Sequence, residues 1–238
     1  MKQYKISILI PSWNGAPYIE NCINSILEND YPNFRIISIA GGTDNAYDIS
    51  LRLQEKNSEK VLALSRKEGK KNDALNLGLK HADGDILVIT DVDCLYQEDW
   101  LMKINEAFQD KKKNVITGFS LPYQKHNGSL AEYNRIKMGY NNIKFADGEK
   151  IIGNKLWGGN SAFRADVFSN KIGRFETEST TGDDKILGME FNRKGEDVYF
   201  IRDIYVYTEH YSGNLKKFMN QRIRWARDLF IDFTWKDI

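Results

Sequence analysis

DILVITDVDC, residues 85–94, joins an apolar run directly to two acidic residues. The run at 85–90 is almost continuously apolar, which is typical of a strand buried on both faces of a parallel sheet. Asp91 and Asp93 follow at a spacing of two, so an extended segment would point both carboxylates the same way, toward the edge of that sheet. The stretch predicts an α/β fold with acidic side chains at the end of a central strand.

Three similar strands precede this one, and helical patterns separate them. The strands are expected at 6–10, 34–40 and 61–65. The helical patterns lie around 19–27, 49–53 and 74–79. This β–α alternation predicts a mostly parallel central sheet with helices on both faces.

The second half of the chain is more mixed. Strands are expected at 115–121, 198–201 and 204–208, helices at 129–140 and 183–192, and a looser segment over 155–168. No internal repeat, low-complexity tract or Pro-rich linker divides the sequence. We therefore expect one compact domain over residues 1–238.

The bulk composition excludes several classes of protein. Of the 238 residues, 41% are hydrophobic and 12% aromatic, which is typical of a folded globule and not of a disordered chain. The net charge of +1 gives no reason to expect a nucleic-acid partner. No apolar run approaches the ~20 residues that cross a bilayer. Two well-separated cysteines, Cys22 and Cys94, indicate a reducing, cytoplasmic setting without a disulfide framework.

Polar or Gly-rich stretches follow the four expected parallel strands. They are 11–14, 40–44, 66–71 and 91–93. Ligands of such sheets bind beyond the carboxyl ends of the strands, so these stretches are expected to line a site. Magnesium is commonly held by one or two carboxylates together with the phosphates of a substrate. Asp91 and Asp93 therefore predict a metal–diphosphate site, whereas the alternative is two solvated aspartates in a loop.

A second acidic pair opens an expected helix in TTGDDKILGMEF, residues 180–191. Asp183 is a favourable helix N-cap, and Asp184 suits the positive end of the helix. A carboxylate held at a helix start beside a cleft is equally suited to act as a general base. Spacing alone does not separate these two interpretations.

Near the end of the sequence, NQRIRWARD, residues 220–228, places Gln221, Arg224 and Trp225 on one helical face. An amide, a guanidinium and an indole together can bind a flat, polar, negatively charged ligand. The same residues can also pack a terminal helix on the core, and the two roles are compatible.

Taken in order, five segments resemble the family 2 glycosyltransferases. They are SILIPSWNGAPYIENCINSIL (7–27), KKNDALNLGLKHADGDILVITDVD (70–93), WGGNSAFRADVF (157–168), TGDD (181–184) and QRIRW (221–225). The last segment matches the Q-x-x-R-W motif of membrane-associated cellulose, chitin and hyaluronan synthases. The resemblance implies a GT-A fold with a Rossmann-like sheet. Residues 1–120 would form a nucleotide-sugar-binding half and residues 121–238 an acceptor-binding half that carries the base.

The resemblance also implies a reaction. A sugar would move, with inversion of its anomeric configuration, from a nucleotide diphosphate, expected to be UDP, to a saccharide or lipid-linked acceptor. The product would belong to the synthesis of cell-surface polysaccharides or glycans. Asp184 would be the general base, with Asp183 beside it, and Asp93 and Asp91 would hold Mn²⁺ or Mg²⁺. The implied donor-binding residues are Pro11, Trp13, Asn14, Asp44, Lys71, Asp73, Asp91, Asp93 and Arg224. The implied acceptor-binding residues are Gly158, Gly159, Asn160, Gln221 and Trp225.

The sequence departs from the family pattern in IAGGTDN, residues 39–45. Ala40 and Gly41 stand where a base-recognising carboxylate is expected, and Asp44 or Asp73 would have to compensate. His210 is a candidate for an extra metal ligand, although a lone loop histidine is more often a surface residue.

The segment after residue 213 is basic and aromatic, which is typical of a helix lying on an anionic membrane surface. We therefore expect a catalytic domain at the cytoplasmic face of the membrane, peripheral to it or severed from a longer chain. Two rival hypotheses are a non-catalytic sugar- or nucleotide-binding relative, favoured by Ala40–Gly41, and a nucleotidyltransferase. The second is disfavoured because PSWNGAPY, residues 11–18, lacks the basic, Gly-rich phosphate loop that it requires.

Overall fold

The structure is a computed structural model of the chain. It describes residues 1–123, 132–133, 136, 148, 150–151, 156–177, 183–208, 215–216, 219–220 and 223. Most of the helix expected over 129–140 therefore lies outside the described residues, as do His210, Gln221, Arg224 and Trp225. Asp183 is placed as the first residue of a helix, but its side chain is not described.

Strands and helices alternate along the first hundred residues as expected. The strands are β1 (Ile6–Trp13), β2 (Phe34–Gly41), β3 (Val61–Arg66), β4 (Ile86–Thr90), β5 (Cys94–Leu95), β6 (Val115–Thr117), β7 (Ser120–Pro122), β8 (Lys150–Ile151), β9 (Asn160–Arg164), β10 (Val198–Phe200) and β11 (Val206–Thr208). The helices are α1 (Ile19–Leu27), α2 (Ala46–Lys56), α3 (Lys71–Leu79), α4 (Trp100–Ala107), α6 (Ala165–Lys171) and α7 (Asp183–Arg193).

The central sheet has the strand order β3-β2-β1-β4-β9-β6-β10-β8. Neighbouring strands pair in parallel from β3 to β4, and β6 pairs in parallel with β10. Strand β9 runs antiparallel between β4 and β6, and β8 runs antiparallel to β10. The prediction of a mostly parallel sheet in an α/β fold is confirmed.

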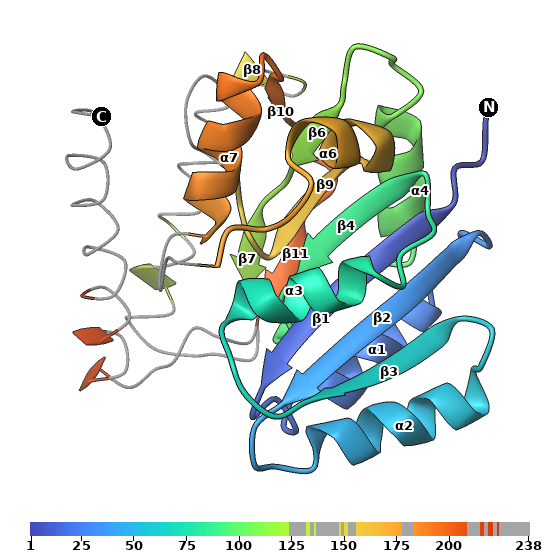
Figure 1. The fold of residues 1–238 in the computed structure, drawn as a ribbon, viewed down its shortest axis with the longest axis vertical. Helices are drawn as coiled ribbons and strands as arrows, with labels where there is room; N and C mark the ends of the chain where they lie inside the picture. Colours follow the sequence, from blue (N-terminus) through green and yellow to red (C-terminus); the bar gives the residue numbers. More distant parts are fainter. Residues whose placement is uncertain are drawn as a thin grey trace.

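Both faces of the sheet are buried, as the apolar run in β4 indicates. Ile86 and Val88 join the core on one face, together with residues of α1, α2 and α4. Leu87 and Ile89 join the core on the opposite face, together with residues of α3, α6 and α7. In Figure 1, α3, α6 and α7 lie in front of the sheet, while α1 and α4 lie behind it. Alternate side chains of one strand thus hold two helical layers.

The single strand expected over 115–121 is two strands in different sheets. Strand β6 belongs to the central sheet, and β7 joins a second sheet of order β5-β11-β7. The break falls at Gly118, where an added Cβ would lie 2.4 Å from the carbonyl oxygen of Ile204. The backbone of another segment occupies that space, so the chain bends between the sheets. Helix α4 and the ordered β9 and α6 within 157–171 were also not anticipated.

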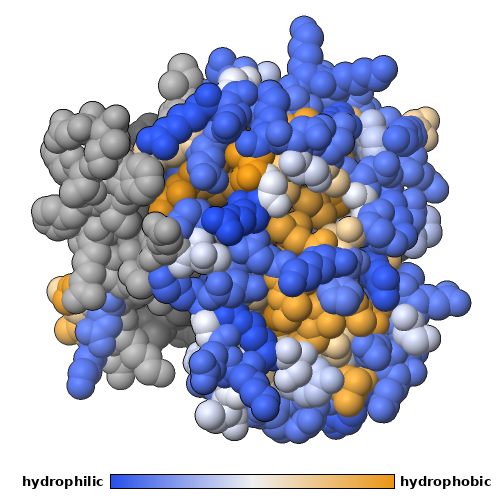
Figure 2. Space-filling view, in the orientation of Figure 1, coloured by the Kyte–Doolittle hydropathy of each residue, from blue (hydrophilic) through white to orange (hydrophobic). Residues whose placement is uncertain are grey.

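Among the described residues, no helix is both long and apolar enough to span a membrane. Figure 2 shows that hydrophilic residues cover most of the described surface on the face that carries α3, with apolar residues visible between the covering elements.

Candidate active site

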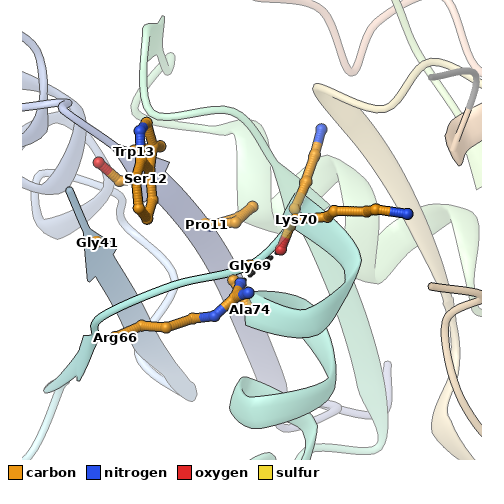
Figure 3. Close-up of a pocket in the computed structure, with 9 residues that line it drawn as sticks. Pro11, Ser12, Trp13, Gly41, Arg66, Gly69, Lys70 and Ala74 are labelled. Atoms are coloured by element: carbon orange, nitrogen blue, oxygen red, sulfur yellow. Dashed lines mark hydrogen bonds between the residues drawn. The ribbon is translucent and has the colours of Figure 1, made fainter. Parts of the chain in front are cut away.

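A pocket opens where the carboxyl ends of the first three strands meet the start of α3 (Figure 3). Its lining residues are Pro11, Ser12, Trp13, Gly41, Arg66, Gly69, Lys70, Lys71 and Ala74. The pocket lies where the position of ligands in parallel sheets predicts it. Pro11, Trp13 and Lys71 were named from the sequence, and Arg66 was recognised only as part of a polar stretch.

Trp13 and Gly41 explain the departure from the family pattern at the end of β2. The Trp13 side chain is 54% exposed, and Figure 3 shows its ring standing over the pocket. A Cβ added at Gly41 would lie 3.0 Å from the indole Cε3 and 3.0 Å from the carbonyl oxygen of Arg66. A side chain at position 41 would therefore meet both the indole and the backbone of β3, which leaves little room there for the expected carboxylate.

Asn14 and Asp44 frame the pocket by linking the loops that follow β1 and β2. The Oδ1 atom of Asn14 accepts a hydrogen bond from the backbone N–H of Thr43 at 2.8 Å. The Oδ2 atom of Asp44 accepts one from the N–H of Ala16, also at 2.8 Å. Neither residue lines the pocket. Their contacts in this structure organise the loops, and their contact with a donor stays a prediction.

Asp73 has a similar organising role in the loop between β3 and α3. Its Oδ2 atom accepts a hydrogen bond from the N–H of Lys70 at 2.8 Å and pairs with the Arg66 guanidinium at 3.1 Å. Arg66 also donates to the carbonyl oxygen of Lys70 at 2.5 Å. The Arg66 guanidinium is thereby fixed at the pocket wall. The contact between Asp73 and a base edge stays a prediction.

Asp91 and Asp184 are brought together by the turn at Gly158 and Gly159. Thr90 pairs with Asn160 across β4 and β9, which sets Gly159 opposite Asp91. A Cβ at Gly159 would lie 2.9 Å from Asp91 Oδ2. One residue earlier, the N–H of Gly158 donates to Asp184 Oδ2 at 3.2 Å. Two acidic motifs that lie about ninety residues apart in sequence thus meet on the two sides of one glycine pair.

Lys71 completes this cluster. Its Nζ lies 2.5 Å from Asp91 Oδ1, and a Cβ at Gly158 would lie 3.4 Å from the same Nζ and 3.2 Å from Asp184 Cβ. A side chain at Gly158 or Gly159 would therefore crowd the charged groups. This gives a physical reason for the Gly-Gly motif, and it places Lys71 beside both carboxylates.

Asn160 requires a correction, because it was expected to bind the acceptor. Its side chain is only 1% exposed. The amide nitrogen donates to the carbonyl oxygens of Phe119, at 3.0 Å, and Ile204, and Oδ1 accepts from the Trp100 indole N–H at 3.2 Å. Burial and these three bonds exclude direct contact with an acceptor in this structure. Asn160 instead anchors the end of the glycine turn.

Thr90 is a second anchor that the sequence did not indicate. Its hydroxyl donates to the carbonyl oxygen of Gly159 at 2.7 Å and contacts the Tyr96 hydroxyl.

Nearby, burial raises the pKa values of the thiols of Cys22 and Cys94. The raised pKa values favour the protonated thiols, as is usual for buried cysteines that pack in a core.

The described residues fit a metal only in part. They contain no group of three or more His, Cys, Asp or Glu side chains suited to an ion. Asp91 and Asp93 nevertheless provide the one or two carboxylates by which Mg²⁺ is usually held when phosphate oxygens complete its shell. The side chain of Asp91 is 41% exposed, so it is open to such a ligand.

This combination of fold and site defines a class. The sheet and its helices are those of the GT-A glycosyltransferases. The structure is similar to that of the mannosyltransferase PcManGT from Pyrobaculum calidifontis in complex with GDP-Man and Mn²⁺, with a TM-score of 0.73, 22% identity, and coverage of 96% of this chain and 63% of that chain. It is also similar to S. aureus TarS 1-349 in complex with UDP-GlcNAc, with a TM-score of 0.66, 18% identity, and coverage of 88% and 60%.

The chain belongs to the glycosyltransferase like family 2, whose family model matches residues 3–228. A relative from Methanococcus voltae is 28% identical over 241 residues, which are 93% of this chain and 71% of that protein. It is named dolichyl N-acetyl-alpha-D-glucosaminyl phosphate 3-beta-D-2,3-diacetamido-2,3-dideoxy-beta-D-glucuronosyltransferase. Glycosyltransferase GlyG from Streptococcus pneumoniae is 29% identical over 130 residues, and the match spans 43% of its length. The resemblance noted in the sequence is confirmed.

We predict that Thr90→Val lowers glycosyltransferase activity about tenfold, a loss of about 1.4 kcal/mol of transition-state stabilisation. Valine preserves the volume but removes the hydroxyl that donates to the Gly159 carbonyl, so the turn beside Asp184 loses one of its anchors. The measurement is kcat alongside the melting temperature. Ser50→Ala is the control, because Ser50 is also buried and donates to a backbone carbonyl, that of Ala46. Equal activity of the two variants would contradict the role of Thr90.

Proposed function

We propose that the chain transfers a sugar, with inversion, from a nucleotide diphosphate, most simply UDP, to a hydroxyl of a saccharide or lipid-linked acceptor. The observation that carries the proposal is the meeting of Asp91, Lys71 and Asp184 around the 158–159 turn. It supports a diphosphate site next to the carboxylate at the start of α7.

The donor is proposed to lie in the pocket beside Trp13. The exposed indole offers a face on which a base can stack. Arg66, Lys70 and Lys71 add positive charge to the same wall, and the start of α3 contributes the positive end of its helix dipole. Together these groups suit a nucleotide that carries two phosphates. The structural relatives include complexes with GDP-Man and with UDP-GlcNAc, which supports a nucleotide sugar without choosing its base.

Asp93 and Asp91 are proposed to hold Mn²⁺ or Mg²⁺. When bound, such an ion would neutralise charge that gathers on the departing diphosphate. Lys71 lies close enough to share that task. The Mn²⁺ in the complex of the Pyrobaculum mannosyltransferase supports a divalent ion.

Asp184 is proposed to take the proton from the acceptor hydroxyl. The hydroxyl oxygen then bonds to the anomeric carbon as the bond from that carbon to the diphosphate oxygen breaks, so the configuration inverts and the nucleoside diphosphate leaves with the electron pair. Asp184 accepts hydrogen bonds from the N–H groups of Gly158, at 3.2 Å, and Lys185, at 2.9 Å. These two hydrogen bonds orient the carboxylate, as the role of a general base requires.

Several residues outside the described part of the chain complete the proposal. Arg224 would pair with phosphate oxygens, while Gln221 and Trp225 would contact the acceptor sugar near Gly158 and Gly159. His210 stays a candidate metal ligand. The two halves, 1–120 and 121–238, would divide donor from acceptor binding.

We predict that Asp184→Asn lowers kcat by about 10²–10⁴-fold, which is the usual contribution of a general base. Donor affinity should change little, because Asp184 lies on the acceptor side of the glycine turn. Turnover and calorimetric donor binding would be measured in parallel. Asp166→Asn is the matched control, since Asp166 is an exposed carboxylate in the first turn of α6. A chain with no turnover before substitution, but with intact nucleotide binding, would favour the non-catalytic relative.

Calorimetry with UDP and GDP, each with Mn²⁺ or with a chelator, tests the donor site. We expect metal-dependent binding of UDP, and Trp13→Ala should weaken it about tenfold because stacking on an aromatic ring contributes roughly 1–3 kcal/mol. Trp13→Phe is the control, because it keeps an aromatic face. Preference for GDP would replace uridine by guanosine in the proposal. Unchanged binding by Trp13→Ala would place the base elsewhere.

A peripheral contact with the cytoplasmic face of the membrane is also proposed. Leu215, Met219 and Ile223 are spaced by four residues and are 62%, 48% and 50% exposed. They form one apolar stripe in a segment whose sequence is also basic.

We predict that the chain co-sediments with vesicles containing anionic lipid, and that Leu215→Asp with Met219→Asp abolishes this. Met102→Asp, at an exposed apolar residue of α4, is the control. Equal sedimentation of all variants would contradict the contact.

A further inference from the structure

Lys71 occupies an unfavourable position for a lysine. It is the first residue of α3, where the positive end of the helix dipole disfavours a cation. Arg66 and Lys70 line the same pocket, so two like charges also lie on the same wall. Its Nζ is nevertheless drawn to 2.5 Å from Asp91 Oδ1, with 32% and 41% of the two side chains exposed. The ion pair with Asp91 compensates for these repulsions.

The other two cations of the pocket wall have different partners. The Arg66 guanidinium pairs with Asp73 at 3.1 Å. The Lys70 ammonium donates to the carbonyl oxygen of Thr177 at 2.9 Å. Adjacent lysines therefore have distinct roles, because Lys71 bonds a carboxylate of the D-x-D motif whereas Lys70 bonds backbone across the loop.

The Lys71 ammonium and a divalent ion need the same carboxylate. An ion on Asp91 next to an ammonium 2.5 Å from that group would meet strong like-charge repulsion. A diphosphate removes the conflict, because its oxygens can bind both the ion and the ammonium. Lys71 lines the pocket, so the pocket offers an open direction for the displaced head group.

We infer that Lys71 holds the place of the divalent cation on Asp91 until a nucleotide diphosphate arrives, and that metal and nucleotide therefore bind cooperatively. The inference rests on the proposed function, since it assigns a metal to the D-x-D motif. It adds that the free protein binds the ion weakly because of one lysine. It also adds that the same lysine moves to the diphosphate in the loaded state. By linkage, the ion strengthens nucleotide binding by the factor by which the nucleotide strengthens ion binding.

The test is a titration with Mn²⁺, followed by electron paramagnetic resonance of the free ion, with and without UDP. In the unmodified protein, UDP is expected to tighten Mn²⁺ binding at least about tenfold, within the usual range of coupling between sites. In Lys71→Met, Mn²⁺ should bind about tenfold more tightly without UDP, and addition of UDP should tighten it much less. Lys5→Met is the matched control and should behave like the unmodified protein, because Lys5 also pairs with an aspartate, Asp83, at 2.5 Å but does not line the pocket.

Lys71→Arg provides a second variant that keeps the charge, and it should retain weak Mn²⁺ binding without UDP. Circular dichroism confirms that each variant is folded. Equal or weaker binding of Mn²⁺ by Lys71→Met, in the absence of UDP, would overturn the inference. UDP binding that is independent of Mn²⁺ in all variants would also overturn it, while leaving the nucleotide site intact. Failure of every variant to bind UDP under any condition would instead reject the proposed function, and the inference with it.

Discussion

The close packing of the 158–159 turn between Asp91 and Asp184 is the constraint on which the site depends. The antiparallel pairing of β9 with β4 sets this turn opposite the D-x-D motif, and a backbone N–H of the turn holds the carboxylate at the start of α7. Both positions favour glycine, because a Cβ at Gly159 would collide with Asp91 Oδ2 and one at Gly158 would press against Asp184 and the Lys71 ammonium. One reversed strand in a mostly parallel sheet thus connects the D-x-D motif to the start of α7.

Much of the first half of the fold could be predicted from the sequence, because its signals are local. A strand buried on both faces must be apolar at almost every position, and β4 is. The split of 115–121 between two sheets could not be predicted, because apolar residues continue through the break. The signal was Gly118, and its meaning depends on the carbonyl of Ile204, about eighty-six residues away in sequence. Helix α4 was missed because its 8 residues give little more than two turns of helical pattern.

Residues of the candidate site could be predicted from the sequence where the proposed chemistry requires a particular residue type. They could be predicted less well where the role of a residue arises from packing. Asp91, Asp184 and the glycine pair were identified because carboxylates and Gly-Gly carry meaning in a sequence. Asn160 was misassigned, because a polar residue beside such a motif suggests a ligand, whereas its amide is buried and joins Phe119 and Ile204. Thr90 gave no signal, since its role arises only from the carbonyl that its hydroxyl contacts.

The contact between Trp13 and Gly41 has a consequence for how this sequence can vary. The two residues lie on neighbouring strands, and the indole fills the space that a side chain at position 41 would need. A carboxylate can be restored at the end of β2 only if the ring on β1 becomes smaller or moves. The two positions are therefore expected to covary among related sequences, with a side chain at position 41 accompanied by a smaller or displaced ring at position 13.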